Sequence, residues 1–277
     1  AQPVVRVDDI SVITSVRTQT ITVRAWVRND TDTQQTVGLA NTVQLGVEPV
    51  LDLPSRQVTI QPHETAMVET SAEWKDPQLW GFEPYGSPVL YHLATRLNDA
   101  SGSFIDARYT RFGFREFWID GDRFILNGRP IFLQGEQAQF YMHTSYGQNR
   151  RWLTMYFKAL RDANVNFIRL PHGVFFPVWA EVADEVGMLL ESEPMPGVPT
   201  VGSGADFASG EAVLAEKAEK TWVQGFERKA HLSTVSRWVR EWRNHPSLVL
   251  WSTDNESGSQ YTVADPAVFQ FQKQIKD

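Results

Sequence analysis

Polar side chains follow each of four short apolar segments that lie beyond residue 129 of the 277-residue chain. The segments are residues 130–135, 166–170, 188–192 and 247–252, and the polar residues at their ends are Gln134, Glu136, Gln137, Arg169, His172, Glu191, Glu193, Asp254, Asn255 and Glu256. The carboxyl ends of parallel strands meet at one edge of a sheet, so we expect these side chains to surround one site. A pair of carboxylates there can protonate a glycosidic oxygen and attack the sugar. The pattern therefore indicates glycoside chemistry.

Motifs for other reaction classes are missing from this sequence. It has no cysteine, and its histidines at positions 63, 92, 143, 172, 231 and 245 form no HExxH or comparable metal-binding pair. GxSxG, P-loop and strand-linked GxGxxG motifs are also absent, which argues against serine hydrolases, P-loop proteins and dinucleotide enzymes. We therefore expect neither a metal nor another cofactor.

Two regions with different apolar periods position these residues. Up to about residue 112 apolar residues alternate with polar ones, as in Ile21, Val23, Ala25 and Val27 or in Val89, Tyr91 and Leu93, which predicts seven or so half-buried strands of a sandwich. After Phe117 wholly apolar runs alternate with segments of helical period, which is typical of parallel strands covered by helices. Helices are predicted over residues 152–163, 178–186 with Gly187 as C-cap, and 211–243, which hold one helix or two and end before Pro246. The predicted domains are residues 1–115 and 116–277.

The net charge and the hydropathy of the sequence argue against two classes of partner, nucleic acids and membranes. The formal net charge is −7, with no basic field to attract nucleic acid. No run approaches the roughly 18 apolar residues of a membrane span, so we expect no membrane insertion. The composition leaves the compartment open, with a periplasmic or secreted location slightly favoured over a cytoplasmic one.

Residues 243–257, with the sequence RNHPSLVLWSTDNES, resemble the signature of glycoside hydrolase family 2. Three further segments resemble the family in the same order along the chain. The end of that family's immunoglobulin-like domain is matched by residues 76–93, and its sandwich-to-barrel junction with the first strand by residues 112–136. Its second and third strands are matched by residues 159–193. The resemblance implies an immunoglobulin-like β-sandwich followed by the first four β/α units of a TIM barrel. It also implies a retaining, exo-acting β-glycosidase of the bacterial β-galactosidase, β-glucuronidase and β-mannosidase type.

The resemblance also assigns roles to single residues. Glu256 would be the general acid/base, Asn255 would hydrogen-bond the sugar 2-hydroxyl, and Arg169 and His172 would shape the sugar subsite. A mouth lined by Trp251 and carboxylates would raise the pKa of Glu256 and favour its acid form. Glu136 and Glu193 would either line the site or brace Arg169 as structural ion pairs.

Three departures from the family pattern bear on the substrate. Asp254 stands where a Gly usually precedes Asn-Glu, and the loops after the first two strands are GEQAQFYMH and LPHGVFF instead of the sequences familiar in β-galactosidases. These loops choose the sugar hydroxyls that are recognised. A β-galactoside, a β-glucuronide, a β-mannoside or a marine-polysaccharide oligomer therefore all stay open as substrates.

The length of the second region leads to a further expectation. An eight-stranded barrel needs about 250 residues, whereas four strands are counted here, and the resemblance puts the nucleophile on a seventh strand beyond Asp277. We expect the isolated chain to be inactive without the missing barrel half or a partner subunit; a homo-oligomer is a further option. One alternative is a non-catalytic carbohydrate-binding or adaptor protein. Another is a different barrel hydrolase whose second carboxylate is Glu136, Glu191 or Glu193.

Overall fold

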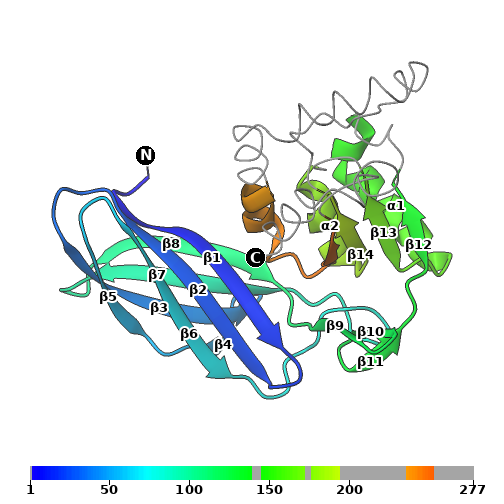
Figure 1. Ribbon diagram of the computed structural model, residues 1–277, viewed down its shortest axis with the longest axis horizontal. Helices are drawn as coiled ribbons and strands as arrows, with labels where there is room; N and C mark the ends of the chain where they lie inside the picture. Colours follow the sequence, from blue (N-terminus) through cyan, green and yellow to red (C-terminus); the bar gives the residue numbers. More distant parts are fainter. Residues whose placement is uncertain (1, 139–144, 172–175, 194–234, 253–277) are drawn as a thin grey trace, which may run out of the picture.

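The N-terminal half of the chain is an antiparallel β-sandwich (Figure 1). The structure is a computed structural model that describes residues 2–138, 145–171, 176–193 and 235–252. Eight strands lie in the sandwich, where the sequence predicted seven or so: β1 (Val5–Ser15), β2 (Thr20–Asn29), β3 (Gln35–Leu45), β4 (Glu48–Asp52), β5 (Arg56–Ile60), β6 (Thr65–Glu73), β7 (Tyr91–Asp99) and β8 (Phe104–Phe112). One sheet has the order β1-β2-β6. The other has the order β4-β3-β7-β8, with β5 also paired to β3.

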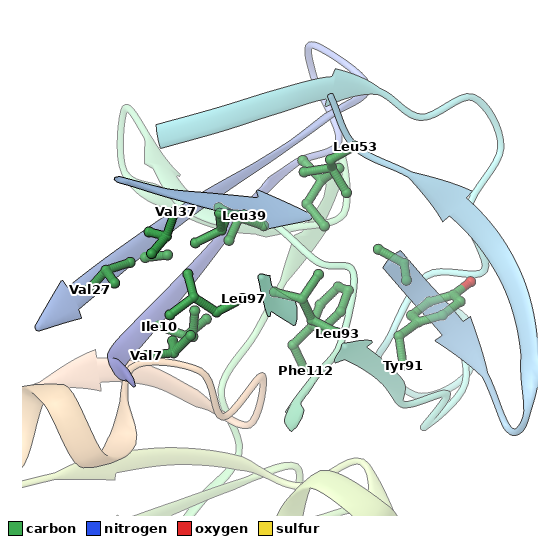
Figure 2. Packing of buried hydrophobic residues seen from close by; sticks show 14 of the residues in the cluster. Val7, Ile10, Val27, Val37, Leu39, Leu53, Tyr91, Leu93, Leu97 and Phe112 are labelled. Atoms are coloured by element: carbon green, nitrogen blue, oxygen red, sulfur yellow. The ribbon is translucent and has the colours of Figure 1, made fainter. Parts of the chain in front are cut away.

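The sandwich core follows from the period of two. Side chains of a strand alternate between its two faces, and the inward set of β2, which includes Ile21, Val23 and Val27, is fully buried. It packs against apolar residues of the opposite sheet such as Leu39 and Leu93, and Figure 2 shows these layers meeting between the sheets. The alternation read from the sequence is therefore confirmed.

A small antiparallel sheet connects the sandwich to the α/β region. Its strands are β9 (Phe117–Asp120), β10 (Arg123–Leu126) and β11 (Arg129–Ile131), in the order β11-β10-β9. Asn127 and Gly128 between β10 and β11 have φ values of 52° and 84°, as a two-residue hairpin turn requires. The prediction of a parallel strand over residues 130–135 is thus wrong, because Pro130 and Ile131 pair with β10.

Four parallel strands form the second half in the order β12-β13-β14-β15. They are β12 (Gly135–Gln137), β13 (Phe167–Leu170), β14 (Leu189–Ser192) and β15 (Leu248–Trp251), and the connecting elements include η2 (Ser145–Gln148), α1 (Arg150–Asp162) and α2 (Val178–Val186). The last three strands and both α-helices lie within a residue or two of their predicted positions. Gly187 adopts φ 74° at the end of α2, which confirms the predicted C-cap. Of the helix predicted over residues 211–243, residues 235–242 are helical and residues 211–234 lie outside the described residues.

The parallel sheet has one face toward the helices and one face away from them. Ile168, Leu170 and Leu190 point to α1, α2 and residues 235–242, where they join a buried apolar cluster. On the opposite face Phe167 and Leu189, near the amino ends of their strands, pack against the β9–β11 sheet and Trp80. The carboxyl ends of the strands on this second face carry the polar residues. Among the described helices, none combines the length and apolarity needed to cross a membrane.

Candidate active site

Three polar side chains form a row across the parallel sheet. Gln137 is in register with Arg169, and Arg169 is in register with Glu191, so the three residues share a face of β12, β13 and β14. This face points away from the helices, because the alternate residues Ile168 and Leu170 belong to the core beneath α1 and α2. Arg169 Nη1 donates to Gln137 Oε1 at 3.2 Å, and Arg169 Nε lies 3.5 Å from Glu191 Oε1. The row therefore centres on Arg169.

Glu193 holds Arg169 from the end of β14. Its side chain is 1% exposed, and its Oε1 accepts from Arg169 Nε at 3.0 Å and from Arg169 Nη2 at 2.5 Å. A charged group so deeply buried needs a partner of opposite charge, and Arg169 supplies it. Of the two roles that the sequence left open for Glu193, the geometry supports the structural brace.

Glu191 has an unusual electrostatic environment for a carboxylate. Burial raises the pKa of Glu191 above its usual value and the charge of Glu193 adds to this effect, although Arg169 partly opposes it. Its side chain stays 20% exposed. Glu191 therefore keeps its proton to higher pH than a free glutamate does while it remains accessible to a ligand.

Glu136 and Trp251 are not brought into the row. Glu136 is in register with Ile168, so it lies on the opposite face from Arg169, and it is exposed. Trp251 is in register with Ser192, and its ring packs edge-on against Trp238 of the helical residues 235–242 at 4.6 Å between centroids. The geometry therefore gives Glu136 no part in bracing Arg169.

The remaining predicted site residues lie outside the described residues. They are His172, Asp254, Asn255 and Glu256, and their roles stay predictions. In the sequence, Asp254 follows the last residue of β15 by three positions, and β15 adjoins β14 with its Glu191. Across the described part of the chain, no three histidine or acidic side chains are grouped as a metal site would need.

Family models match both halves of the chain. The model described as glycosyl hydrolases family 2, TIM barrel domain, matches residues 117–277, and the model described as glycosyl hydrolases family 2 matches residues 5–115. The chain belongs to glycosyl hydrolases family 2.

Solved structures with the family 2 fold include enzymes with different named activities. A β-glucuronidase of Bacteroides uniformis is 22% identical with a TM-score of 0.70, over 92% of this chain and 29% of that one. A putative β-galactosidase from Bacteroides fragilis is 20% identical with a TM-score of 0.72, over 98% of this chain and 38% of that one. An exo-chitosanase of Amycolatopsis orientalis is 18% identical with a TM-score of 0.73, over 98% of this chain and 30% of that one. At these identities the likeness shows the fold, and this family 2 chain spans about a third of their lengths.

The sequence did not predict the place of Glu191 beside Arg169 in this family 2 chain. The sequence places Glu191 among the polar residues that follow the strands but gives it a role only as an alternative second carboxylate, whereas in the structure it completes the row with Gln137 and Arg169. The signal was present in the segment MLLESE, residues 188–193, where a period of two puts Leu189, Glu191 and Glu193 on one face. The alternation is hard to recognise in the sequence, because Met188, Leu189 and Leu190 are all apolar and all buried, whichever face of the sheet they lie on.

Proposed function

We propose that this chain supplies the immunoglobulin-like domain and the first part of the catalytic barrel of a retaining, exo-acting β-glycosidase. The observation that carries the proposal is the polar row of Gln137, Arg169 and Glu191 at the carboxyl ends of parallel strands in a family 2 chain. Ligands of α/β barrels bind at this end of the sheet. Asp254, Asn255 and Glu256 follow the neighbouring strand β15 in the sequence.

In this proposal Glu256 is the general acid/base. It gives its proton to the glycosidic oxygen while the bond from that oxygen to the anomeric carbon breaks. A nucleophilic carboxylate from outside residues 1–277 bonds to the anomeric carbon, and Glu256 then takes a proton from the water that releases the sugar. Asn255 binds the 2-hydroxyl, and His172 and Arg169 shape the subsite, with Arg169 held in place by Glu193.

A second candidate keeps both carboxylates within this chain. Glu191 fits the role of general acid in this candidate better than Glu193 or Glu136, because it is partly exposed on the face of the row and its raised pKa favours the protonated form. Retention would require about 5–5.5 Å between the carboxyl groups of Glu191 and Glu256, and inversion about 6.5–9.5 Å.

The test uses the complete gene product with a panel of aryl β-glycosides that differ in sugar and in leaving group. Phenyl glycosides need protonation of the leaving oxygen, whereas 2,4-dinitrophenyl glycosides hardly need it. We expect Glu256→Gln to lower kcat/KM about 10²–10⁴-fold on the phenyl glycoside, with much less effect on the dinitrophenyl glycoside. Azide should restore turnover of the latter as a β-glycosyl azide, since azide attacks without giving up a proton.

Glu191→Gln serves as the matched control. If Glu256 is the acid/base, Glu191→Gln will show neither the leaving-group dependence nor azide rescue. The opposite pattern would favour the second candidate. If the wild-type protein binds glycosides but hydrolyses none of them, the proposed function is wrong and a carbohydrate-binding or adaptor role replaces it.

A further inference from the structure

The first five residues of the family signature, Arg243–Ser247, lie away from the polar row and contact the sandwich. They connect the helical residues 235–242 to β15, which begins at Leu248. Among the described strands β15 pairs with β14 alone. The contacts of this segment with the sandwich therefore give β15 a second point of attachment.

Asn244 makes the central contact with β1. Its Oδ1 accepts from Val12 N at 2.9 Å, and its Nδ2 donates to Ile10 O at 2.9 Å. Both backbone groups point outward from β1, which is the edge strand of the sheet β1-β2-β6. The side-chain amide thus bonds to the edge as a neighbouring strand would.

Arg243 strengthens the same contact. Its Nη2 donates to Asp9 Oδ2 at 2.7 Å and to Ile10 O at 3.2 Å, and its guanidinium lies 4.7 Å from the centre of the Trp26 ring. The side chains of Arg243 and Asp9 are 18% and 17% exposed, so their ion pair is only partly screened by solvent.

The opposite side of the segment is fixed by Asp184 of α2, whose side chain is 1% exposed. Asp184 Oδ1 accepts from Ser247 N at 3.1 Å, and Asp184 Oδ2 lies 2.6 Å from His245 Nδ1. The sandwich side contributes Trp80, whose indole nitrogen donates to Asp184 O at 2.8 Å. The segment is therefore held between β1 and α2.

Arg115 fixes the start of β15 directly. Its Nε donates to Pro246 O at 3.0 Å and its Nη2 to Leu248 O at 2.7 Å. Burial lowers the pKa of Arg115 to about 10, and the charges of Asp184 and Glu116 act in the opposite direction. These two hydrogen bonds use two of the five N–H groups of the half-buried guanidinium, and both tie it to the backbone at the start of β15.

We propose that Asn244 is a positioning residue, through which the edge of the sandwich sets the place of β15 and so of the acid/base that follows it. The kinetic consequence rests on the proposed function, since Glu256 comes five residues after Trp251. A general acid works only within hydrogen-bonding reach of the leaving oxygen, so a small displacement of β15 weakens protonation. Binding of the sugar depends on many residues of the site besides the acid/base, so we expect a displacement of β15 to weaken binding less than it weakens protonation.

The kinetic test compares two variants that each lose a pair of amide hydrogen bonds. Asn244→Ala loses its bonds to β1, and Asn41→Ala loses those to Thr70 Oγ1 at 3.1 Å and Thr95 Oγ1 at 2.7 Å inside the sandwich. In the complete gene product we expect Asn244→Ala to lower kcat/KM about 10-fold on a phenyl β-glycoside and less than about 2-fold on the dinitrophenyl glycoside. Asn41→Ala should affect both substrates equally. Equal losses on both substrates for Asn244→Ala would overturn the proposal.

A second measurement does not depend on catalysis. In native-state hydrogen exchange the amides of β15 should lose protection about 5-fold in Asn244→Ala for each hydrogen bond removed, and stay as in wild type in Asn41→Ala. Asn244→Asp keeps the acceptor for Val12 N, so the protection of its β15 amides should lie between that of wild type and that of Asn244→Ala. This variant provides the measurement if the alanine variant folds poorly. Unchanged protection of β15 in both Asn244 variants refutes the positioning role. A wild-type protein without glycosidase activity refutes the proposed function, and exchange then decides on Asn244.

Discussion

Removing the charge of Arg169 should destabilise the protein strongly, because the buried Glu193 would lose the two hydrogen bonds and the opposite charge that Arg169 supplies. The two charges are 3.0 Å apart at Arg169 Nε and Glu193 Oε1, and at an effective dielectric constant of about 20 they attract by about 5.5 kcal/mol. Arg169 is 33% exposed, so water screens part of this attraction. We therefore expect Arg169→Met to lower the free energy of unfolding by about 3 kcal/mol at neutral pH.

The double variant Arg169→Met/Glu193→Met should recover most of this loss and come within about 1 kcal/mol of wild type, because apolar side chains replace a buried ion pair at little cost. The assay is urea unfolding of wild type, the two single variants and the double variant as a double-mutant cycle. Arg24→Met is the matched control: its pair with Glu69 is 2.7 Å long but both side chains are 45% exposed, so the loss should stay below about 1 kcal/mol. Additive losses for Arg169 and Glu193 would show that the ion pair with Arg169 is not the reason why Glu193 tolerates burial.

Two further predictions concern the domain junction and the sheet edge. A methyl group at Gly113 would lie 2.6 Å from Trp80 Cβ and 2.8 Å from Pro246 Cβ, so Gly113→Ala should lower the free energy of unfolding by about 1–3 kcal/mol. Gly38→Ala is the control and should not lower it, because a methyl group there meets nothing within 4 Å. Thermal unfolding of the two variants measures the difference, and equal melting temperatures would contradict the prediction. Burial raises the pKa of Glu191 above its usual value of 4.5, so the folded chain binds this proton more tightly than the unfolded chain, and stability falls as pH rises from about 4.5 through the raised pKa. Glu191→Gln should remove this fall, which urea unfolding between pH 4 and 8 measures; an unchanged pH dependence would refute the assigned environment.

Local periodicity predicted most of the fold, because each element buries a face that its own residues define. The alternation of Ile21, Val23 and Val27 gave a sandwich strand, and the C-cap at Gly187 gave the end of α2. The first parallel strand was misplaced, since the apolar run at residues 130–135 resembles a buried strand. The Asn127–Gly128 turn was the stronger signal, because it folds the chain back and pairs residues 129–131 with β10.

The candidate site was less accessible to sequence reasoning, because it depends on register between strands far apart in the chain. The sequence offered both Glu136 and Glu193 as partners of Arg169. Only the pairing of Glu136 with Ile168 puts it on the other face, and no local pattern encodes that pairing. Likewise, the sequence identified Pro246 as the end of a helix but gave no sign that Asn244 bonds to β1.

The amide of Asn244 also has a consequence for biosynthesis, because it follows Val12 by 232 residues. At roughly 5–20 residues per second, the ribosome delivers Asn244 roughly ten to fifty seconds after β1 has emerged. Throughout that interval Val12 N and Ile10 O have no partner from this part of the chain, and the nascent sandwich presents a bare strand to water, to chaperones and to neighbouring nascent chains. Translation speed between Val12 and Asn244 therefore sets how long this edge of the newborn protein is exposed to mispairing.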